Sequence, residues 1–522
     1  MKKIIVFLMN GLLVLLLSSG IVYATPANSV RDITISGPVC DGMHGWAYGT
    51  YFGDIRKYDY IEEEYFLSGT AQSCQPVNEL TGDGRWTVEM QNAEPYETRI
   101  LVRRPANDDK FNGTVIVEWA DMSNGYELTY SEAQGIYENG FAYVSVTADK
   151  ASVDSLREWD NERYGDLNIP KAGMAYDIFK QAAQAIGPQR QIGTKDPMNG
   201  LAVKQMIAVG VSDAGSAVLS YANAVQPVNN TFDALIIAVC GGEARDFGSD
   251  AHTIGTLVRN DLTVPVMVLN SQSEALDYVQ YRQPDTSLFR SWEIAGASHA
   301  PDEQSRFLRN KTDRDGITDA VKRTYEEYPP NEINWLYTLD AAYLRVHEWI
   351  TDSTAPQSFE PIAIENNAYV LDAYGNVLGG VRLPEMEIPT ARYIARPEQP
   401  QAGYTIRFSE EELTSLYPNH EAYITKITEA AAEAENAGVI LPYRTEEYIN
   451  MAKTASVPEI LRPDISNPLI KYLCIAAVIL ILVIVVIVSL IVWRVRVHRK
   501  KKSGQEGKLI KTKKTQEKEA GK

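Results

Sequence analysis

Short apolar runs alternate along the chain with longer stretches in which apolar residues recur at helical spacing. Runs of four to eight apolar residues are typical of buried strands, and their alternation with helical stretches favours parallel strands joined by crossover helices. The predicted strands are 97–103, 113–120, 141–148, 204–210, 234–239, 264–269 and 289–295. The predicted helices include 131–139, 175–185, 215–224 and 332–351. The pattern predicts an α/β fold with a doubly wound, mostly parallel sheet.

The pattern changes after residue 355. Gly379-Gly380 and the segment 396–403 predict loops, whereas 409–438 predicts a helical hairpin. We expect residues 25–355 to form the α/β core and residues 356–460 to form a C-terminal extension that packs on it. Residues 461–471 would then be a stalk.

Both ends of the chain carry hydrophobic segments. Lys2 and Lys3 precede an apolar run, and small residues follow near position 24, so residues 1–24 are predicted to be a secretory signal peptide. Residues 473–492 carry no charge and as a helix would be about 30 Å long, which matches a bilayer core. We therefore expect a transmembrane helix at 472–493. The basic residues that follow predict a cytoplasmic tail at 494–522 and place the large domain outside the cell membrane.

The charge distribution agrees with this division. The tail 494–522 holds twelve Lys and Arg against three Asp and Glu. Subtracting its +9 and the +2 of the leader from the −18 of the whole chain leaves −29 for the region between them. A strongly acidic domain repels nucleic acid, so nucleic acid is not an expected partner.

Cysteines and metal motifs are sparse. The chain has 4 cysteines, of which Cys474 lies in the predicted span, Cys40 and Cys74 could pair, and Cys240 follows an apolar run as a small buried residue. The sequence contains no His-Glu-x-x-His motif, no Cys-x-x-Cys motif and no nucleotide-binding glycine loop. We therefore expect neither a metal nor a cofactor.

The segment 204–215 joins an apolar strand to the motif Gly210-Val-Ser212-Asp-Ala214. A serine on a sharp strand-to-helix turn presents its Oγ as a nucleophile, and the start of the helix that follows favours a developing negative charge. Ser212 is therefore the predicted nucleophile.

A serine nucleophile needs a histidine base and an acid that orients it, and on such a sheet the chain order is serine, acid, histidine. His299 follows the last predicted strand, where a base would project over the serine. His252 precedes a short helical piece and is a weaker candidate, while His347 and His420 lie in predicted helices. His299 is the predicted base.

The sequence leaves alternatives for the acid and for the donors of the oxyanion hole. Glu274 and Asp277 both follow the predicted strand 264–269, and Glu274 is preferred because it lies nearer the strand end. The oxyanion hole needs two backbone N–H groups. One is expected from Asp213, and the other from Asp121 or Met122 at the start of the loop after the strand 113–120.

Taken together, these motifs resemble a family of large secreted bacterial alpha/beta hydrolases, over roughly residues 30–458. Besides the serine turn, the resemblance rests on Val115–Trp119, Trp159-Asp160-x-x-Arg163-Tyr164-Gly165, Tyr176-Asp177-Ile-Phe179, Arg282-Gln283-Pro284-Asp285, Trp292-Glu-x-Ala-Gly296-x-x-His299 and Leu416-Tyr-Pro-x-His420. It implies an alpha/beta-hydrolase fold with Ser212 as nucleophile and His299 as base. Two residues depart from the expected pattern, namely Asp213 after the serine and a glutamate at 274.

The sequence predicts a membrane-anchored extracytoplasmic serine hydrolase that cleaves carboxylic esters through an acyl-enzyme. Its expected substrate is a small-molecule or lipid-like ester. Two alternatives stay open: a peptidase or amidase with the same triad, and an inactive surface receptor or adhesion domain on a hydrolase scaffold.

Overall fold

A computed structural model describes residues 33–191, 195–248, 253–317, 328–395, 403–458, 480 and 482–496. The chain divides into two compact units, Met1–Ala455 and Ser456–Lys522. The predicted leader, stalk and most of the predicted tail lie outside the described residues.

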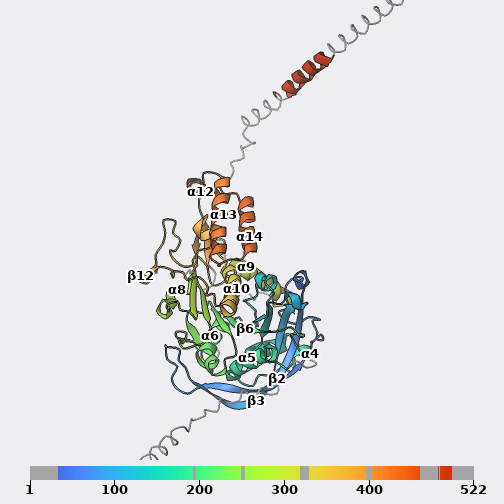
Figure 1. Ribbon diagram of the computed structural model, residues 1–522, viewed down its shortest axis with the longest axis vertical. Helices are drawn as coiled ribbons and strands as arrows, with labels where there is room; N and C mark the ends of the chain where they lie inside the picture. The colour runs from blue at the N-terminus through green and yellow to red at the C-terminus, as the bar shows by residue number, and fades with distance from the viewer. Residues whose placement is uncertain are drawn as a thin grey trace, which may run out of the picture. The chain divides into compact units, whose positions relative to one another are not determined.

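A nine-stranded sheet forms the centre of the first unit (Figure 1). Its strand order is β1-β2-β3-β5-β4-β6-β7-β10-β11. Neighbours from β5 to β11 pair in parallel, whereas β1/β2, β2/β3 and β3/β5 pair antiparallel. The strands are β1 (Thr34–Ser36), β2 (Tyr60–Pro76), β3 (Val88–Pro105), β4 (Thr114–Trp119), β5 (Ala142–Val146), β6 (Gln205–Val211), β7 (Ala234–Ala238), β10 (Val266–Ser271) and β11 (Phe289–Ile294). The predicted mostly parallel α/β sheet is confirmed.

Helices cover both faces of this sheet. The core helices are α2 (Gln134–Glu138), α3 (Lys150–Trp159), α4 (Asn161–Tyr164), α5 (Ala175–Ile186), α6 (Asp213–Ser220), α7 (Gln226–Asn229), α8 (Gln272–Tyr278), α9 (Asp302–Arg314) and α10 (Leu336–Asp352). Short 3-10 turns lie at η1 (Ile55–Tyr58), η2 (Asp108–Lys110), η3 (Ala172–Met174) and η5 (Val279–Tyr281), and α6 continues into a π-helical turn, η4 (Tyr221–Val225). The small strands β8 (Glu243–Arg245) and β9 (Thr253–Gly255) form a separate pair.

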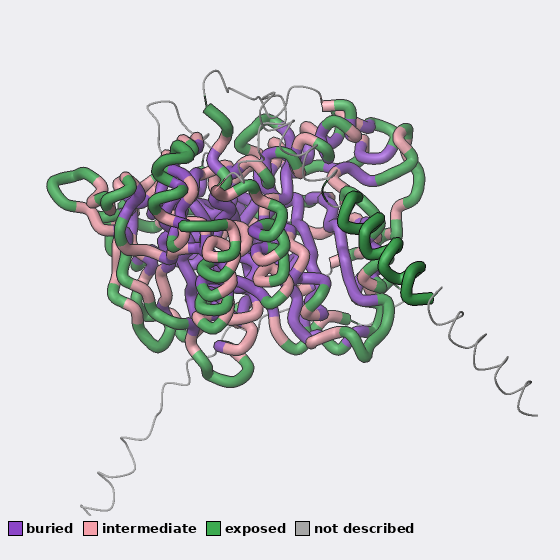
Figure 2. The backbone as a smooth tube through the Cα atoms, turned by 90° about the horizontal axis from the view of Figure 1, so that it is seen from above, coloured by how far each residue is buried: buried purple, intermediate pink, exposed green. Residues whose placement is uncertain are grey.

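Alternation along the central strands sorts their side chains into two hydrophobic layers. In β4, Val117 and Trp119 pack in the layer that contains α5 and α6, whereas Ile116 packs in the layer that contains α10. Because both faces are buried, these strands are apolar almost throughout, and Figure 2 shows buried backbone concentrated inside the unit.

Each predicted strand overlaps an observed one, but the long β2/β3 pair is largely missing from the prediction. β2 is 17 residues long and contains three consecutive glutamates at 62–64, which hide its alternation. These side chains face arginines, since Arg103 pairs with Glu62 at 2.6 Å and Arg99 pairs with Glu64 at 2.7 Å. Charge pairing between distant segments therefore stabilises a strand that the local pattern does not indicate.

The segment after residue 355 contributes two small strand pairs and four helices to the same unit. They are β12 (Ile364–Glu365), β13 (Ala368–Tyr369), α11 (Pro384–Glu387), β14 (Ala391–Ile394), β15 (Tyr404–Arg407), α12 (Glu410–Leu416), α13 (His420–Asn436) and α14 (Pro442–Thr454). Ile427, Ala431 and Tyr448 share a hydrophobic cluster with Tyr343 of α10. This segment thus packs against the core helix, although the predicted boundaries at 355 and 460 stay predictions.

In the second unit, residues 482–496 are helical and their apolar side chains are exposed. Within the described part of the chain, no helix combines the length and apolar character needed to cross a membrane. Residues 472–479 and 481 of the predicted span lie outside that part.

The cysteines of the first unit are free thiols, so Cys40 and Cys74 do not pair. Cys40 is exposed, whereas Cys74 is buried, and burial raises its pKa to about 12. Cys240 is partly buried, and burial likewise raises its pKa to about 12, so its thiol is protonated at neutral pH.

Candidate active site

Ser212 occupies the turn between β6 and α6 with φ 59° and ψ −122°. A residue other than glycine at positive φ is strained, and such strain is typical of functional turns. The turn is tight, because a Cβ on Gly210 would lie 2.2 Å from the Ala214 carbonyl oxygen. Glycine at 210 therefore allows α6 to start directly behind the serine.

His299 lies on the loop after β11 and contacts Ser212. Its Nε2 is 3.2 Å from the serine Oγ. Two hydrogen bonds hold the backbone of His299. Its N–H donates to Ser273 Oγ at 2.9 Å, and its carbonyl accepts from the Trp335 indole N–H at 3.0 Å. The ring can therefore accept the hydroxyl proton of Ser212.

Glu274 is the acid that contacts the histidine. Its Oε1 is 2.8 Å from His299 Nδ1, while its Oε2 accepts from the Ser271 N–H at 2.8 Å and from the Ser271 Oγ at 2.7 Å. Ser271 and Glu274 form a capping box at the start of α8, which fixes the carboxylate. The predicted Ser212, His299 and Glu274 are thus joined in one hydrogen-bonded chain.

The electrostatics of the site favour a charged histidine. Burial lowers the pKa of His299, but the hydrogen bond and charge of Glu274 and the charge of Asp121 outweigh it, so the pKa is raised above its ordinary value. An imidazolium formed during a reaction is therefore stabilised in place.

The structure leaves the other candidate residues away from this chain. Asp277 is exposed on α8. The partly buried His347 of α10 has its Nδ1 2.9 Å from Thr114 Oγ1. His420, at the start of α13, has its Nε2 3.3 Å from the Lys453 carbonyl of α14. His252 lies outside the described residues.

The backbone of the loop after β4 corrects one predicted oxyanion donor. The Asp121 N–H donates to the Leu128 carbonyl at 2.8 Å, and the Leu128 N–H donates back to Asp121 at 2.8 Å. The Asp121 N–H is therefore occupied, and its predicted role as a donor is wrong. Among the described residues, the N–H groups of Met122 and Asp213 donate to no acceptor, so these two predicted donors are free.

The Asp121 side chain instead fastens this loop to the start of α6. Its Oδ2 accepts from the Ala214 N–H at 3.1 Å, and its Oδ1 accepts from the Ser123 N–H at 2.9 Å and the Ser123 hydroxyl at 2.5 Å. Burial raises the pKa of Asp121, with a further contribution from the Asp213 charge, against the hydrogen bonds from Ser123. The carboxylate fixes the loop relative to the helix that follows the serine.

Asp213, which the resemblance marked as unusual, is paired with Arg245. The Arg245 Nη2 lies 2.5 Å from Asp213 Oδ2, and its Nη1 lies 2.9 Å from Asp149 Oδ1. Asp149 also accepts from the Trp119 indole N–H at 3.0 Å. The buried guanidinium thus offsets the negative charge next to the serine. Arg245 was not among the predicted site residues, because its local sequence resembles that of any arginine after a strand.

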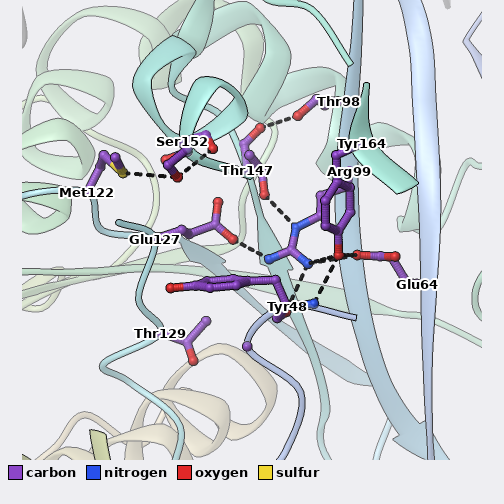
Figure 3. A network of polar contacts seen from close by, with 12 residues as sticks. Tyr48, Glu64, Thr98, Arg99, Met122, Glu127, Thr129, Thr147, Ser152 and Tyr164 are labelled. Atoms are coloured by element: carbon purple, nitrogen blue, oxygen red, sulfur yellow. Dashed lines mark hydrogen bonds and ion pairs between the residues drawn. The ribbon is translucent and has the colours of Figure 1, made fainter. Parts of the chain in front are cut away.

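A buried ion network holds the part of the loop after β4 that contains Glu127 (Figure 3). Arg99 pairs with Glu127 of the loop at 2.5 Å and with Glu64 of β2 at 2.7 Å. The Ser155 hydroxyl lies 3.9 Å from the Met122 sulfur. The loop that carries the Met122 N–H is therefore anchored at both ends.

No group of three or more His, Cys, Asp or Glu side chains in the described ranges is arranged to hold a metal. The expectation of a reaction without metal or cofactor stays a prediction.

Residues 35–450 match the family described as "Alpha/beta hydrolase domain". This match covers most of the chain, including the core, the serine–histidine–glutamate chain and the segment after residue 355. No curated protein matches the sequence.

The solved structures that match this chain are distant. XC6422 from Xanthomonas campestris, an α/β serine hydrolase without a lid, is 14% identical, covers 45% of this chain and 92% of its own, and has a TM-score of 0.26. Esterase Est22, solved with p-nitrophenol, is 10% identical, covers 51% and 84%, and has a TM-score of 0.28. Brefeldin A esterase, a bacterial homologue of human hormone-sensitive lipase, is 13% identical, covers 52% and 80%, and has a TM-score of 0.26. The function is therefore argued from the family and from this chain's own residues.

Proposed function

The chain belongs to the alpha/beta hydrolase domain family, and we propose that it is a serine hydrolase that cleaves carboxylic esters. The observation that carries this proposal is the contact of His299 Nε2 with Ser212 Oγ at 3.2 Å and of His299 Nδ1 with Glu274 at 2.8 Å. This is the order of contacts that a nucleophile, a base and an orienting acid require.

In the first half of the proposed cycle, Glu274 holds the proton of His299 on Nδ1, which leaves Nε2 free to accept. The Ser212 Oγ attacks the ester carbonyl as its proton moves to Nε2, and the same proton then passes to the departing alcohol. The result is an acyl group on Ser212. In the second half, His299 accepts a proton from water, the hydroxide displaces the acyl group, and the proton returns to Ser212 as the acid leaves.

The tetrahedral intermediate in each half carries a negative oxygen. The N–H groups of Met122 and Asp213 are the proposed donors to it, supported by their freedom from other acceptors in the described residues. The start of α6 adds a favourable dipole. Asp121 acts as a positioning residue in this scheme, because its carboxylate joins the loop that carries one donor to the helix that carries the other.

A fluorophosphonate probe tests the proposal, because it reacts covalently with an activated serine. We expect labelling of the intact protein and none of Ser212→Ala, whereas Ser216→Ala, four residues along the chain and buried in α6, keeps it. Ester turnover should fall by about three orders of magnitude or more in Ser212→Ala and in His299→Ala. A folded protein that takes no label and turns over no ester would instead favour the receptor interpretation. Cleavage of amides but not esters would favour the amidase.

We also propose that the chain is anchored in a membrane through 472–493, with the hydrolase unit outside and the tail in the cytoplasm. The uncharged run 473–492 and the basic residues after it support this, and so do the exposed apolar side chains of the described helix 482–496. Protease added to intact cells should remove the hydrolase unit and leave the tail protected. Digestion of the tail with the hydrolase unit intact would reverse the orientation.

A further inference from the structure

A cavity of about 190 Å³ lies between the loop after β4, the start of α9 and the start of α10, and its walls are rich in aromatic rings. Its aromatic lining consists of Tyr51, Tyr58, Tyr130, Tyr137 and Phe307. We propose that this cavity binds the alcohol group of the ester substrate, and that this group carries a single neutral aromatic ring. The proposal rests on the proposed ester hydrolysis.

The walls of the cavity come from the segments that carry the catalytic groups. The loop that starts with Met122 continues to Thr129 and Tyr130, and the segment after His299 enters α9 with Glu303, Gln304 and Phe307. Direct contacts join these parts. Gln304 Nε2 donates to the Tyr130 carbonyl at 3.4 Å. Ser212 itself is not among the lining residues, so a short spacer would join the bound ring to the ester oxygen.

Tyr130 connects the cavity to the site. Its ring lines the cavity, and its hydroxyl accepts from Asn124 Nδ2 at 2.6 Å, on the loop of the oxyanion donors. Burial raises the pKa of Tyr130, and the charge of Asp121 adds to this, so the hydroxyl stays protonated. The cavity also lies on the His299 side of the site, since Asn334 and Leu336 flank the tryptophan that holds the His299 carbonyl. His299 delivers its proton to the departing alcohol, and the group that binds here is therefore the alcohol.

The charged side chains in the cavity lining are either paired or exposed. Glu132 lies 3.1 Å from Lys311 Nζ and accepts from the Tyr137 hydroxyl at 2.6 Å. Glu303 accepts from Asn334 Nδ2 at 3.0 Å, and Arg444 pairs with Glu447 at 2.5 Å. Lys57 and Glu303 are exposed to solvent. The rest of the lining offers a ligand rings, hydroxyls and amides, which suit a neutral group.

The rings and the volume point to an aromatic occupant. Tyr137 stacks on Tyr58 at 5.2 Å and meets Tyr51 edge-on at 5.5 Å, so ring faces and edges are both presented. An apolar cavity of about 150 Å³ binds benzene, which makes a cavity of about 190 Å³ suitable for one ring with a small substituent.

The test fills the cavity by Ala133→Phe. Ala133 has an extended backbone with φ −140° and ψ 155°, which a phenylalanine adopts readily, and its side chain makes no capping hydrogen bond. Ala432→Phe, on the exposed face of α13, is the matched control. Leu336→Trp fills the same cavity from α10, and serves if Ala133→Phe fails to fold by circular dichroism.

The first measurement needs no turnover. Phenol should bind to Ser212→Ala in ligand-detected NMR, with at least tenfold weaker affinity when Ala133→Phe is added and unchanged affinity when Ala432→Phe is added. Equal binding in all three proteins, or none in any, overturns the proposal. Failure of the proposed function shows separately, as loss of fluorophosphonate labelling at Ser212.

The second measurement uses turnover. The ratio of kcat/KM for 3-phenylpropyl acetate to that for propyl acetate should fall at least tenfold in Ala133→Phe and stay constant in Ala432→Phe, and phenol should compete with 3-phenylpropyl acetate. An unchanged ratio, or noncompetitive inhibition by phenol, overturns the proposal because the cavity would then not hold the substrate.

Discussion

The substitution Glu274→Gln tests the catalytic chain most sharply, because it keeps the size of the side chain and changes only its charge and donors. Glu274 accepts three hydrogen bonds, from His299 Nδ1 at 2.8 Å, from the Ser271 N–H at 2.8 Å and from the Ser271 Oγ at 2.7 Å. A glutamine has one acceptor oxygen, so it cannot serve both residues. The amide group of this glutamine can be oriented in two ways, and the two orientations have different consequences for catalysis.

With the amide oxygen toward His299, the histidine keeps its productive tautomer, but the amide N–H₂ faces the Ser271 N–H. An unsatisfied donor of this kind costs about 1–3 kcal/mol. With the oxygen toward Ser271, the capping box is kept and the N–H₂ donates to Nδ1, so the His299 proton moves to Nε2. That proton then faces Ser212 and prevents Nε2 from acting as a base. The second placement is favoured, and it is inactive.

We therefore expect kcat to fall by about 10³ to 10⁴, similar to the effect of the equivalent change in the triad of a serine protease. KM and the melting temperature should change little, because the substrate contacts and the capping box remain. The assay is steady-state hydrolysis of phenyl acetate with thermal unfolding in parallel. Asp277→Asn is the control, and since Asp277 is exposed it should cost less than about tenfold. A folded Glu274→Gln protein that keeps a tenth of its kcat would refute the assignment, and a crippled Asp277→Asn would transfer it to Asp277.

Three further predictions follow from the same contacts. The acidic limb of the profile of kcat/KM against pH should lie above the ordinary histidine pKa of about 6.5, because the raised pKa of His299 keeps the base protonated to higher pH. Asp121→Asn removes one of the charges that raise this pKa, so it should move the limb to lower pH. A limb that Asp121→Asn leaves in place would show that this carboxylate does not act on the histidine. Burial raises the pKa of Glu118 to about 8, so the folded protein binds a proton that the unfolded chain has released, and this contribution to stability is lost as pH rises from about 4.5 to 8. Glu118→Gln should accordingly raise the free energy of unfolding by a few kcal/mol, to order of magnitude, at pH 9 and hardly change it at pH 4, and an equal effect at both pH values in denaturant titrations would contradict this. Gly210→Ala should lower stability by about 1–3 kcal/mol, because its Cβ would meet the Ala214 carbonyl at 2.2 Å, whereas a neutral effect in thermal unfolding would mean that the turn relaxes freely.

The sequence by itself determined the strands of the parallel sheet and the place of Ser212 and His299 along it. Those strands are buried on both faces, and a continuous apolar run is a property of the residues alone. Parallel strands bring the loops at their carboxyl ends to one edge of the sheet, so the order serine, acid, histidine already implied that these loops meet.

The tertiary structure decided between groups that share a loop. Glu274 and Asp277 both follow β10, but α8 begins at Gln272 and the capping box turns only Glu274 back toward His299. Likewise Asp121 and Met122 are neighbours, yet the pairing of Asp121 with Leu128 occupies the Asp121 N–H, whereas the Met122 N–H donates to no acceptor among the described residues. Composition and hydrophobic periodicity cannot predict which of two adjacent residues has its N–H group hydrogen-bonded.

Tertiary structure also decided how the charges are paired. Arg245 offsets Asp213 from 32 residues away, and Arg99 connects β2 to Glu127 in the loop after β4. The sequence shows only that these residues carry charge. Hydrophobic periodicity is local and can be read along the chain. The partner of a buried charge instead depends on which distant segments the fold brings within about 3 Å of it. A partner is needed because an unpaired buried charge costs too much free energy.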